Sequence, residues 1–212
     1  MLIENCAAGG RRMDYQMMSR SHSYCRDDAH MFKDCDELTQ NITLNSTAYI
    51  PITGGETFTV PVFNDYAFLS RLAAGTVFSP TDFQGMLLKR MPSLEELEWF
   101  RRMFSLAKRI QRFFLGDYYA LTDNPFDSSE IYCAYQLHLP ETSEGFFAVF
   151  RRKDCPIATF TPALHAINPD ATYKVEEFNG ETTQMSGKQL SFWNLQFDKP
   201  CTCRCFFYNQ EA

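Results

Sequence analysis

The chain has 212 residues, of which 45% are hydrophobic and 15% aromatic, and its net charge is −6. This length suits one domain or two small ones, and the apolar content is ample for a buried core. The negative charge argues against a nucleic-acid surface, because binding to phosphates requires a basic face. No apolar run approaches the roughly 20 residues that a membrane helix needs.

The start of the chain and its cysteines indicate a compartment. Met1 leads directly into a short apolar run, without the basic start and long apolar core of a signal peptide. The eight cysteines are irregularly spaced, which favours free thiols in a reducing compartment over a disulfide scaffold. We therefore expect a cytoplasmic protein, and no sequence feature calls for a cofactor.

The first thirty residues contain two short apolar runs that each end in small or charged residues. Leu2-Ile3 is typical of the end of a buried strand, and the small residues 7–10 let a ligand approach the backbone. Residues 15–21 indicate a short helix, Ser23-Tyr24-Cys25 a second strand, and Asp27-Asp28 stand at its end. This order predicts the βαβ arrangement of a parallel sheet or β/α barrel, whose active sites lie at the carboxyl ends of the strands.

These residues also resemble a known family. Cys6-x-x-Gly9-Gly10-x-Arg12-x-Asp14, followed by Arg26-Asp27-Asp28, looks like the C-x-x-G-G-x-R-x-D and S-D blocks of glycoside hydrolase family 36, the α-galactosidase-like enzymes. In that family the blocks close the fifth and sixth strands of a β/α barrel. The resemblance implies that Asp28 is the general acid/base and that the sugar is bound by Cys6, Gly9, Arg12 and Asp27.

Two positions depart from the family pattern at this block. Asp27 stands where the family usually has serine, and Cys25 stands where it has tryptophan. Asp14, the last residue of the first block, is expected to support the loop rather than to contact the sugar.

A retaining glycosidase needs a second carboxylate, roughly 5 Å from the first, as nucleophile. In the family it stands in a lysine-x-aspartate motif at the end of the fourth strand. Lys33-Asp34-Cys35-Asp36 lies in a polar stretch with helical character, so we do not assign it this role. We therefore expect the C-terminal half of a (β/α)8 TIM barrel, with the nucleophile missing from this chain.

Further helices and strands are expected in the first half. An apolar face over Met31, Phe32, Cys35, Leu38 and Ile42 predicts a helix from Ala29 to Leu44. Residues 49–55 indicate a strand and a turn, for which a plain surface turn is favoured over an active-site loop. A helix entering a loop is predicted over 64–75, with Ala67 and Leu69 where the family commonly has an acid and an arginine, and 76–78 would be the eighth strand.

The longest helix signal runs from Ser93 to Leu115. Ser93 and Glu96 form a capping box, and apolar residues then recur at helical spacing. The polar face carries five cations, which favours a solvated helix face over a basic binding helix. They are Arg101, Arg102, Lys108, Arg109 and Arg112.

The second half has strand periodicity. Residues 116–122 are similar to the family's link between barrel and C-terminal domain. From about residue 127 the pattern alternates, with strands over 131–137, 145–150, 172–177 and 201–207. We predict two domains, 1–122 as the C-terminal half of the barrel and 123–212 as an antiparallel β-sandwich with turns at 168–170 and 179–180.

The cysteine and histidine residues allow both structural and functional interpretations. Cys201-x-Cys203-x-Cys205 would place three thiols on one face of a strand, which favours buried structural thiols over a metal site. His22 and His30 flank the acid site, and either could bond a sugar hydroxyl or have no particular role. His138 and His165 carry no functional signal.

Three functions follow from these observations. The first is the C-terminal part of a retaining α-galactosidase-like hydrolase acting on an α-galactoside or similar carbohydrate, with a neighbouring Asp27 that raises the pKa of Asp28 by like-charge repulsion. The second is a non-catalytic carbohydrate-binding or vestigial scaffold protein derived from such an enzyme. The third is an unrelated structural protein whose cysteines bind metal. Because half a barrel exposes unpaired edges, we also expect a homo-oligomer or another association through them.

Overall fold

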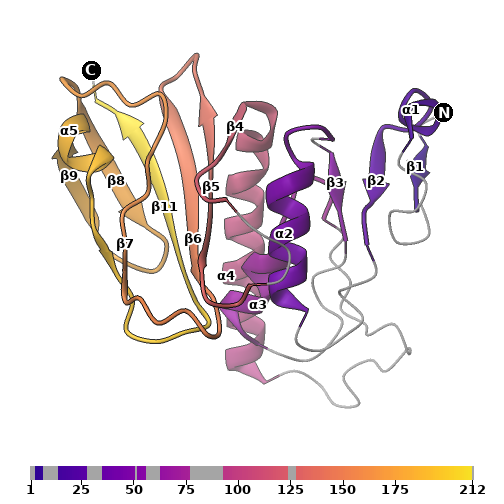
Figure 1. The fold of residues 1–212 in the computed structure, drawn as a ribbon, viewed down its shortest axis with the longest axis horizontal. Coiled ribbons are helices and arrows are strands. Elements are labelled where there is room, and N and C mark those ends of the chain that lie inside the picture. Colours follow the sequence, from indigo (N-terminus) through magenta and orange to yellow (C-terminus); the bar gives the residue numbers. More distant parts are fainter. Residues whose placement is uncertain are drawn as a thin grey trace. The chain divides into compact units, whose positions relative to one another are not determined.

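The computed structural model describes residues 3–6, 14–27, 35–50, 52–55, 63–76, 93–123 and 128–211. They fall into two compact units, Met1–Arg109 and Ile110–Ala212. Figure 1 shows the order of the elements along the chain. The first unit holds a small parallel sheet with helices, and the second is built on a large antiparallel sheet.

The first unit contains three short parallel strands in chain order. They are β1 (Glu4–Asn5), β2 (Ser23–Cys25) and β3 (Thr53–Gly54), and β2 pairs with both neighbours. Figure 1 shows them side by side. Parallel neighbours need a crossover connection, and helices α1 (Tyr15–Met18) and α2 (Asp36–Ser46) lie in the two connections. The βαβ order predicted from the sequence is confirmed for these strands.

Helix α1 is shorter than predicted. It begins at an N-cap formed by Asp14, whose Oδ1 accepts a 2.9 Å hydrogen bond from the backbone N–H of Met17. Ser19 ends the helix after a single turn, and its hydroxyl donates to the carbonyl of Gln16. The predicted supporting position of Asp14 is therefore a helix cap.

Helix α2 buries mainly polar residues, and the apolar face predicted for it is wrong at Leu38, which is 42% exposed. Residues 29–34 of the predicted helix lie outside the described residues. The buried polar groups find partners, because Thr43 donates to the carbonyl of Thr39 at 3.0 Å and Gln40 Nε2 donates to Ser70 Oγ at 2.8 Å. The residues buried along α2 are Thr39, Gln40, Asn41, Thr43 and Leu44.

Helix α3 (Asp65–Arg71) confirms the helix predicted after Asn64. The Asn64 side chain caps it by accepting from the N–H of Tyr66 at 2.9 Å. The Arg71 guanidinium pairs with the Asp36 carboxylate of α2 at 3.0 Å, so charge as well as packing joins the two helices. Asp65 accepts hydrogen bonds from Trp99 Nε1 at 2.6 Å and from Arg102 at 2.9 Å.

Helix α4 (Leu94–Gln111) is the longest helix in the described residues. The predicted capping box is confirmed, since Ser93 N donates to Glu96 Oε2 at 2.7 Å and Glu96 N donates to Ser93 Oγ at 3.2 Å. Its last predicted turn is instead the 3-10 helix η2 (Arg112–Leu115). The five predicted cationic residues are exposed, as expected of a solvated face.

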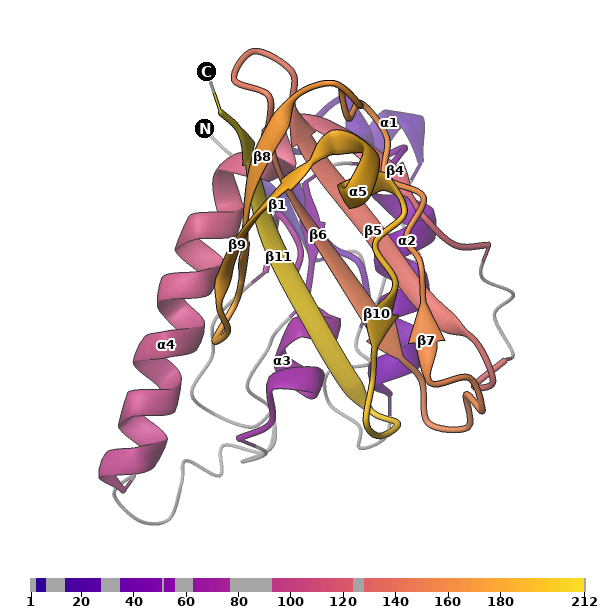
Figure 2. The ribbon, with the colours of Figure 1, turned by 90° about the vertical axis from the view of Figure 1, so that its left-hand side faces the viewer.

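The second unit is organised by a six-stranded sheet in the order β4-β5-β6-β11-β8-β9, in which every neighbouring pair is antiparallel. Figure 2 shows its strands as a continuous layer. The four strands predicted from alternation are present as β5, β6, β8 and β11. The bounds are β4 (Asp117–Ala120), β5 (Tyr132–Leu139), β6 (Glu144–Arg151), β8 (Thr172–Glu177), β9 (Thr182–Ser186) and β11 (Thr202–Gln210).

A smaller layer covers one face of this sheet. It contains β7 (Thr159–Phe160) paired with β10 (Leu195–Gln196), and helix α5 (Gly187–Ser191). Figure 2 shows these elements in front of the sheet. Phe147 and Phe206 of the sheet stack at 4.7 Å, and they share one core with Leu190, Leu195 and Phe197 of the covering layer. The two layers make the unit β-sandwich-like.

Residues 116–122, which resemble the family's link between barrel and C-terminal domain, contain strand β4. It pairs antiparallel with β5 from Asp117 opposite His138 to Ala120 opposite Tyr135. The segment is therefore one of the two edge strands of the sheet, the other being β9.

The thiol positions partly correct the prediction for Cys201-x-Cys203-x-Cys205. Cys201 is exposed, has a backbone φ of 52° and precedes β11, so it does not share the strand face. The thiols of Cys203 and Cys205 lie 3.4 Å apart. None of the eight cysteines, all of which lie in the described residues, forms a disulfide in this structure.

No three His, Cys, Asp or Glu side chains in the described ranges converge as metal ligands. In the same ranges, no helix combines the length and the apolar character that crossing a membrane demands.

Candidate functional site

The carboxyl ends of β1, β2 and β3 meet at one edge of the parallel sheet. Cys6 follows β1, Arg26 and Asp27 follow β2, and Gly55 follows β3. The ladder between the last two strands continues past their ends, since Arg26 N donates to the carbonyl of Gly54 at 3.0 Å. This edge therefore gathers polar groups from successive strands, which is the usual place for an active site in parallel α/β folds.

Arg26 and Asp27 form an ion pair at this edge. Arg26 Nε donates to Asp27 Oδ2 at 3.2 Å, and the two side chains are only 1% and 11% exposed. A buried carboxylate requires such a partner, because leaving water costs a lone charge several kcal/mol (on the order of 5). The sequence pattern did not indicate this pairing.

Three of the residues predicted for the site, Cys6, His22 and Asp27, lie among the described residues. Cys6 is exposed directly after β1. His22 lies before β2, where its Nδ1 is 2.8 Å from the carbonyl oxygen of Ile3. This contact ties the loop before β2 to β1. Gly9, Arg12, Asp28 and His30 lie outside the described residues.

Two glycines shape the carboxyl end of β3, a feature missed by the sequence reasoning. Gly75 N donates to the carbonyl of Thr53 at 3.0 Å, so the segment at 75–76 runs directly beside β3. A Cβ on Gly54 would overlap with the backbone carbonyl of Gly75, whereas one on Gly75 would be 3.1 Å from Thr53. The surface turn favoured for Gly54 is wrong, because Gly54 is a buried strand residue that permits a close backbone approach.

Ala67 and Leu69 lie in the middle of α3, where they are 5% and 4% exposed. Both side chains are therefore part of the packed interior of their unit. An acid or an arginine at either position would need a buried partner.

No protein-family model matches the sequence, and no curated protein matches it. Solved structures do match over 100% of the chain. The galactosidase domain of an α-galactosidase-sucrose kinase has a TM-score of 0.74 at 23% identity, and the family 36 α-galactosidase AgaA of Geobacillus stearothermophilus, in complex with raffinose, has 0.73 at 16%. The α-galactosidase of Lactobacillus brevis has 0.71 at 18%. The chain has the fold of the matching part of these α-galactosidases.

This likeness confirms the fold resemblance stated from the Cys6–Asp14 and Arg26–Asp28 blocks. The chain spans 29% of the length of each of these solved chains.

Proposed function

We propose that this chain is the C-terminal part of a retaining glycoside hydrolase that removes terminal α-galactosyl groups, or a related α-glycoside. The segment would supply the last strands of a (β/α)8 barrel and the C-terminal β-sandwich domain. The observation that carries the proposal is the order of β1, β2 and β3. Three parallel strands in chain order bring Cys6 and the Arg26–Asp27 pair to one edge, and the similar solved structures named above are of α-galactosidases.

In this proposal Asp28 is the general acid/base. It protonates the leaving oxygen in the first step and activates water in the second, while a carboxylate from outside this segment attacks the anomeric carbon. Cys6, Gly9 and Arg12 contact the sugar. Asp27 lies beside the acid, and its ion pair with Arg26 holds it in place.

The test uses the natural protein of the source organism that contains this sequence. Asp28→Asn should reduce hydrolysis of raffinose by at least about 100-fold, because proton transfer by a positioned side chain contributes that much or more. Activated aryl α-galactosides need little protonation, so formation of the glycosyl-enzyme from them should be largely spared.

Asp14→Asn is the matched control, since an asparagine also caps a helix and α1 should persist. Equal loss on raffinose and aryl galactosides, or full activity on both in Asp28→Asn, would contradict the assignment.

A second candidate is a non-catalytic carbohydrate-binding protein derived from such an enzyme. It is favoured by the buried apolar Ala67 and Leu69 at positions where relatives commonly carry an acid and an arginine. Galactoside binding without any turnover by the source protein would select this candidate.

We also propose that the 212-residue chain associates with itself through its exposed half-barrel, because an incomplete barrel leaves strand edges and apolar surface that favour association. Sedimentation of the purified chain should show oligomers. A monodisperse, well-folded monomer would contradict this.

A further inference from the structure

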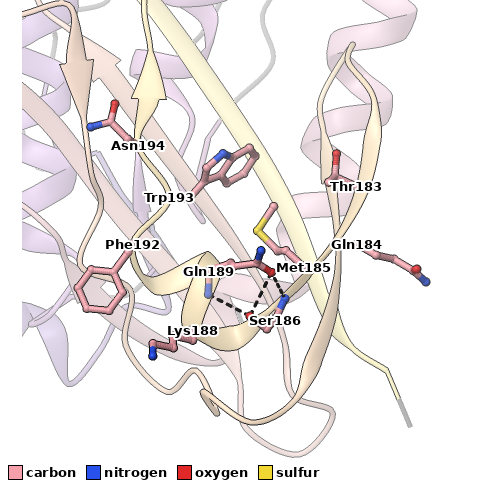
Figure 3. Close-up of a pocket in the computed structure, with 9 residues that line it drawn as sticks. All are labelled: Thr183, Gln184, Met185, Ser186, Lys188, Gln189, Phe192, Trp193 and Asn194. Carbon is pink, nitrogen blue, oxygen red and sulfur yellow. Dashed lines mark hydrogen bonds between the residues drawn. The ribbon is translucent and has the colours of Figure 1, made fainter.

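A pocket of about 620 Å³ lies within the second unit, between strand β9, helix α5 and the segment that leads to β10. Figure 3 shows nine of the residues that line it. The Trp193 ring and the Met185 side chain reach into the space between β9 and the α5 segment, and Thr183 lies on β9, two residues before Met185. The sequence reasoning assigned no role to these residues.

Aromatic groups give the pocket an apolar surface. Trp193 packs edge-on against Phe206 of the core, with ring centroids 4.9 Å apart, and this contact orients the indole. The neighbouring Phe192 also lines the pocket, and its large apolar side chain is 75% exposed to solvent. Exposed aromatic rings of this kind offer a flat face to the C–H groups of a ligand.

Fixed amide groups supply the polar contacts. Gln189 Oε1 accepts hydrogen bonds from Ser186 N at 2.9 Å and from Ser186 Oγ at 3.1 Å, which closes the capping box of α5. The carboxamide is thereby oriented, and Figure 3 shows its nitrogen directed toward Met185 and Trp193. Asn194 Nδ2 donates to Thr161 Oγ1 at 3.3 Å, which leaves its carbonyl oxygen as an acceptor.

The scarcity of charged side chains in the pocket indicates an uncharged ligand. Among the described residues that line the pocket, none is acidic and Lys188 is the one cation. Figure 3 shows the Lys188 amine pointing away from Trp193. The pocket therefore combines aromatic faces with neutral donors and acceptors, a lining suited to an uncharged ligand that has both apolar C–H faces and hydroxyl groups.

We propose that this pocket is an accessory carbohydrate site that binds one neutral hexose unit. The sugar ring stacks on Trp193, with the amide nitrogen of Gln189 and the carbonyl oxygen of Asn194 bonding its hydroxyls. The choice of a galactoside as ligand rests on the proposed function. The site itself is independent of the barrel residues, because all its groups belong to the second unit.

The experiment titrates the 212-residue chain with methyl α-galactoside and measures binding by saturation-transfer NMR and calorimetry. Trp193→Ala should weaken binding by about tenfold, equivalent to about 1.4 kcal/mol, because it removes the ring on which the sugar stacks. Because Trp193 also contacts the core, Phe192→Ala and Asn194→Ala are measured in parallel. These exposed residues can be removed with little effect on packing.

Ile157→Ala is the matched control, because Ile157 is 58% exposed in the same unit and does not line the pocket. Weaker binding in the three pocket variants with unchanged binding in Ile157→Ala supports the site. Binding that is unchanged in the pocket variants but lost in Arg12→Ala overturns it and assigns the sugar to the proposed barrel site instead. Absence of any galactoside binding also overturns it, and the hydrolysis test on Asp28 then decides the proposed function separately.

Discussion

The side-chain amide of Gln136 on β5 donates a 2.7 Å hydrogen bond to the phenolic oxygen of Tyr208 on β11, across the intervening strand β6. Gly145 of β6 makes this possible. It lies opposite both His138 and Tyr208 in the sheet, and the Tyr208 ring occupies the space where a Cβ would be. The same phenolic oxygen lies 3.0 Å from His138 Nδ1.

Gly145→Ala should therefore destabilise the protein strongly. The added Cβ would displace a ring that is 2% exposed, and both hydrogen bonds of its hydroxyl would break. We expect a loss of about 3 kcal/mol, from overpacking together with unsatisfied buried groups. Urea unfolding of the two proteins measures it.

Tyr208→Phe is the matched comparison for the glycine variant. It removes the hydroxyl and keeps the ring, and Gln136 Nε2 retains its bond to the carbonyl of His165 at 2.9 Å. The expected loss is only about 1 kcal/mol. A Gly145→Ala protein as stable as the parent would contradict the proposed arrangement of the ring.

His138 should make stability depend on pH. Burial lowers its pKa below the ordinary value of 6.5, although Asp117 and Glu141 act in the opposite direction. The unfolded chain then binds the proton more readily than the folded one, so the free energy of unfolding decreases as the pH falls below about 6.5, down to the folded-state pKa. Denaturant titrations at pH 7.5 and pH 5.5 measure this decrease.

The His138→Gln variant isolates that contribution. Glutamine can still bond to the Tyr208 hydroxyl but does not titrate. The decrease between the two pH values should be smaller in the variant than in the parent, and an identical decrease would assign the pH dependence to other groups.

Arg151 joins the two layers of the sandwich-like unit. Its Nε and Nη2 donate to the carbonyl of Cys155 at 3.2 and 3.0 Å, and Nη1 donates to the carbonyl of Phe197 at 2.9 Å. Arg151→Met should cost about 3 kcal/mol, because two buried carbonyls lose charged donors. Chemical unfolding tests this against Arg102→Met, whose pair with Asp65 is more than a third exposed and should be worth about 1 kcal/mol or less. Equal effects of the two variants would contradict the argument.

Gly54→Ala should disturb the carboxyl end of β3, because the new methyl group meets the backbone of residues 75 and 76 rather than a flexible side chain. We expect a loss of about 2 kcal/mol or more. Gly75→Ala should cost less, since its Cβ would approach Thr53 only to 3.1 Å. Thermal unfolding of the two variants compares them, and the reverse ranking would contradict this close approach.

The sequence predicted the elements whose side chains carry a periodic signal. Residues 172–177 alternate, and β8 has those bounds, while Ser93 and Glu96 marked the start of α4 correctly. Strand β9 escaped prediction because its first three residues are polar and exposed on an edge, where no alternation is required. Strands β7 and β10 are only two residues long, too short to show a period.

The sequence predicted which strands carry the residues of the candidate site, but it did not predict the contacts between those residues. Motif spacing placed Cys6 and Asp27 at the ends of successive strands, because strand order follows from sequence order in βαβ units. The ion pair between Arg26 and Asp27, and the approach of Gly75 to Thr53, depend on side-chain and backbone positions that spacing does not encode. The buried polar face of α2 was not predicted for the same reason, because the hydrogen-bond partner of the Gln40 amide is Ser70, thirty residues away in the sequence.

Strand β4 has a practical consequence for anyone who dissects this chain. A fragment that begins at residue 123 would lack Asp117–Ala120, and the backbone of β5 would lose the partner it has along Tyr135–His138. The newly bared strand would be a template for intermolecular pairing. A recombinant fragment of the second unit should therefore start near Ile110, and its solubility relative to the shorter fragment would report how much this one edge strand protects the sheet.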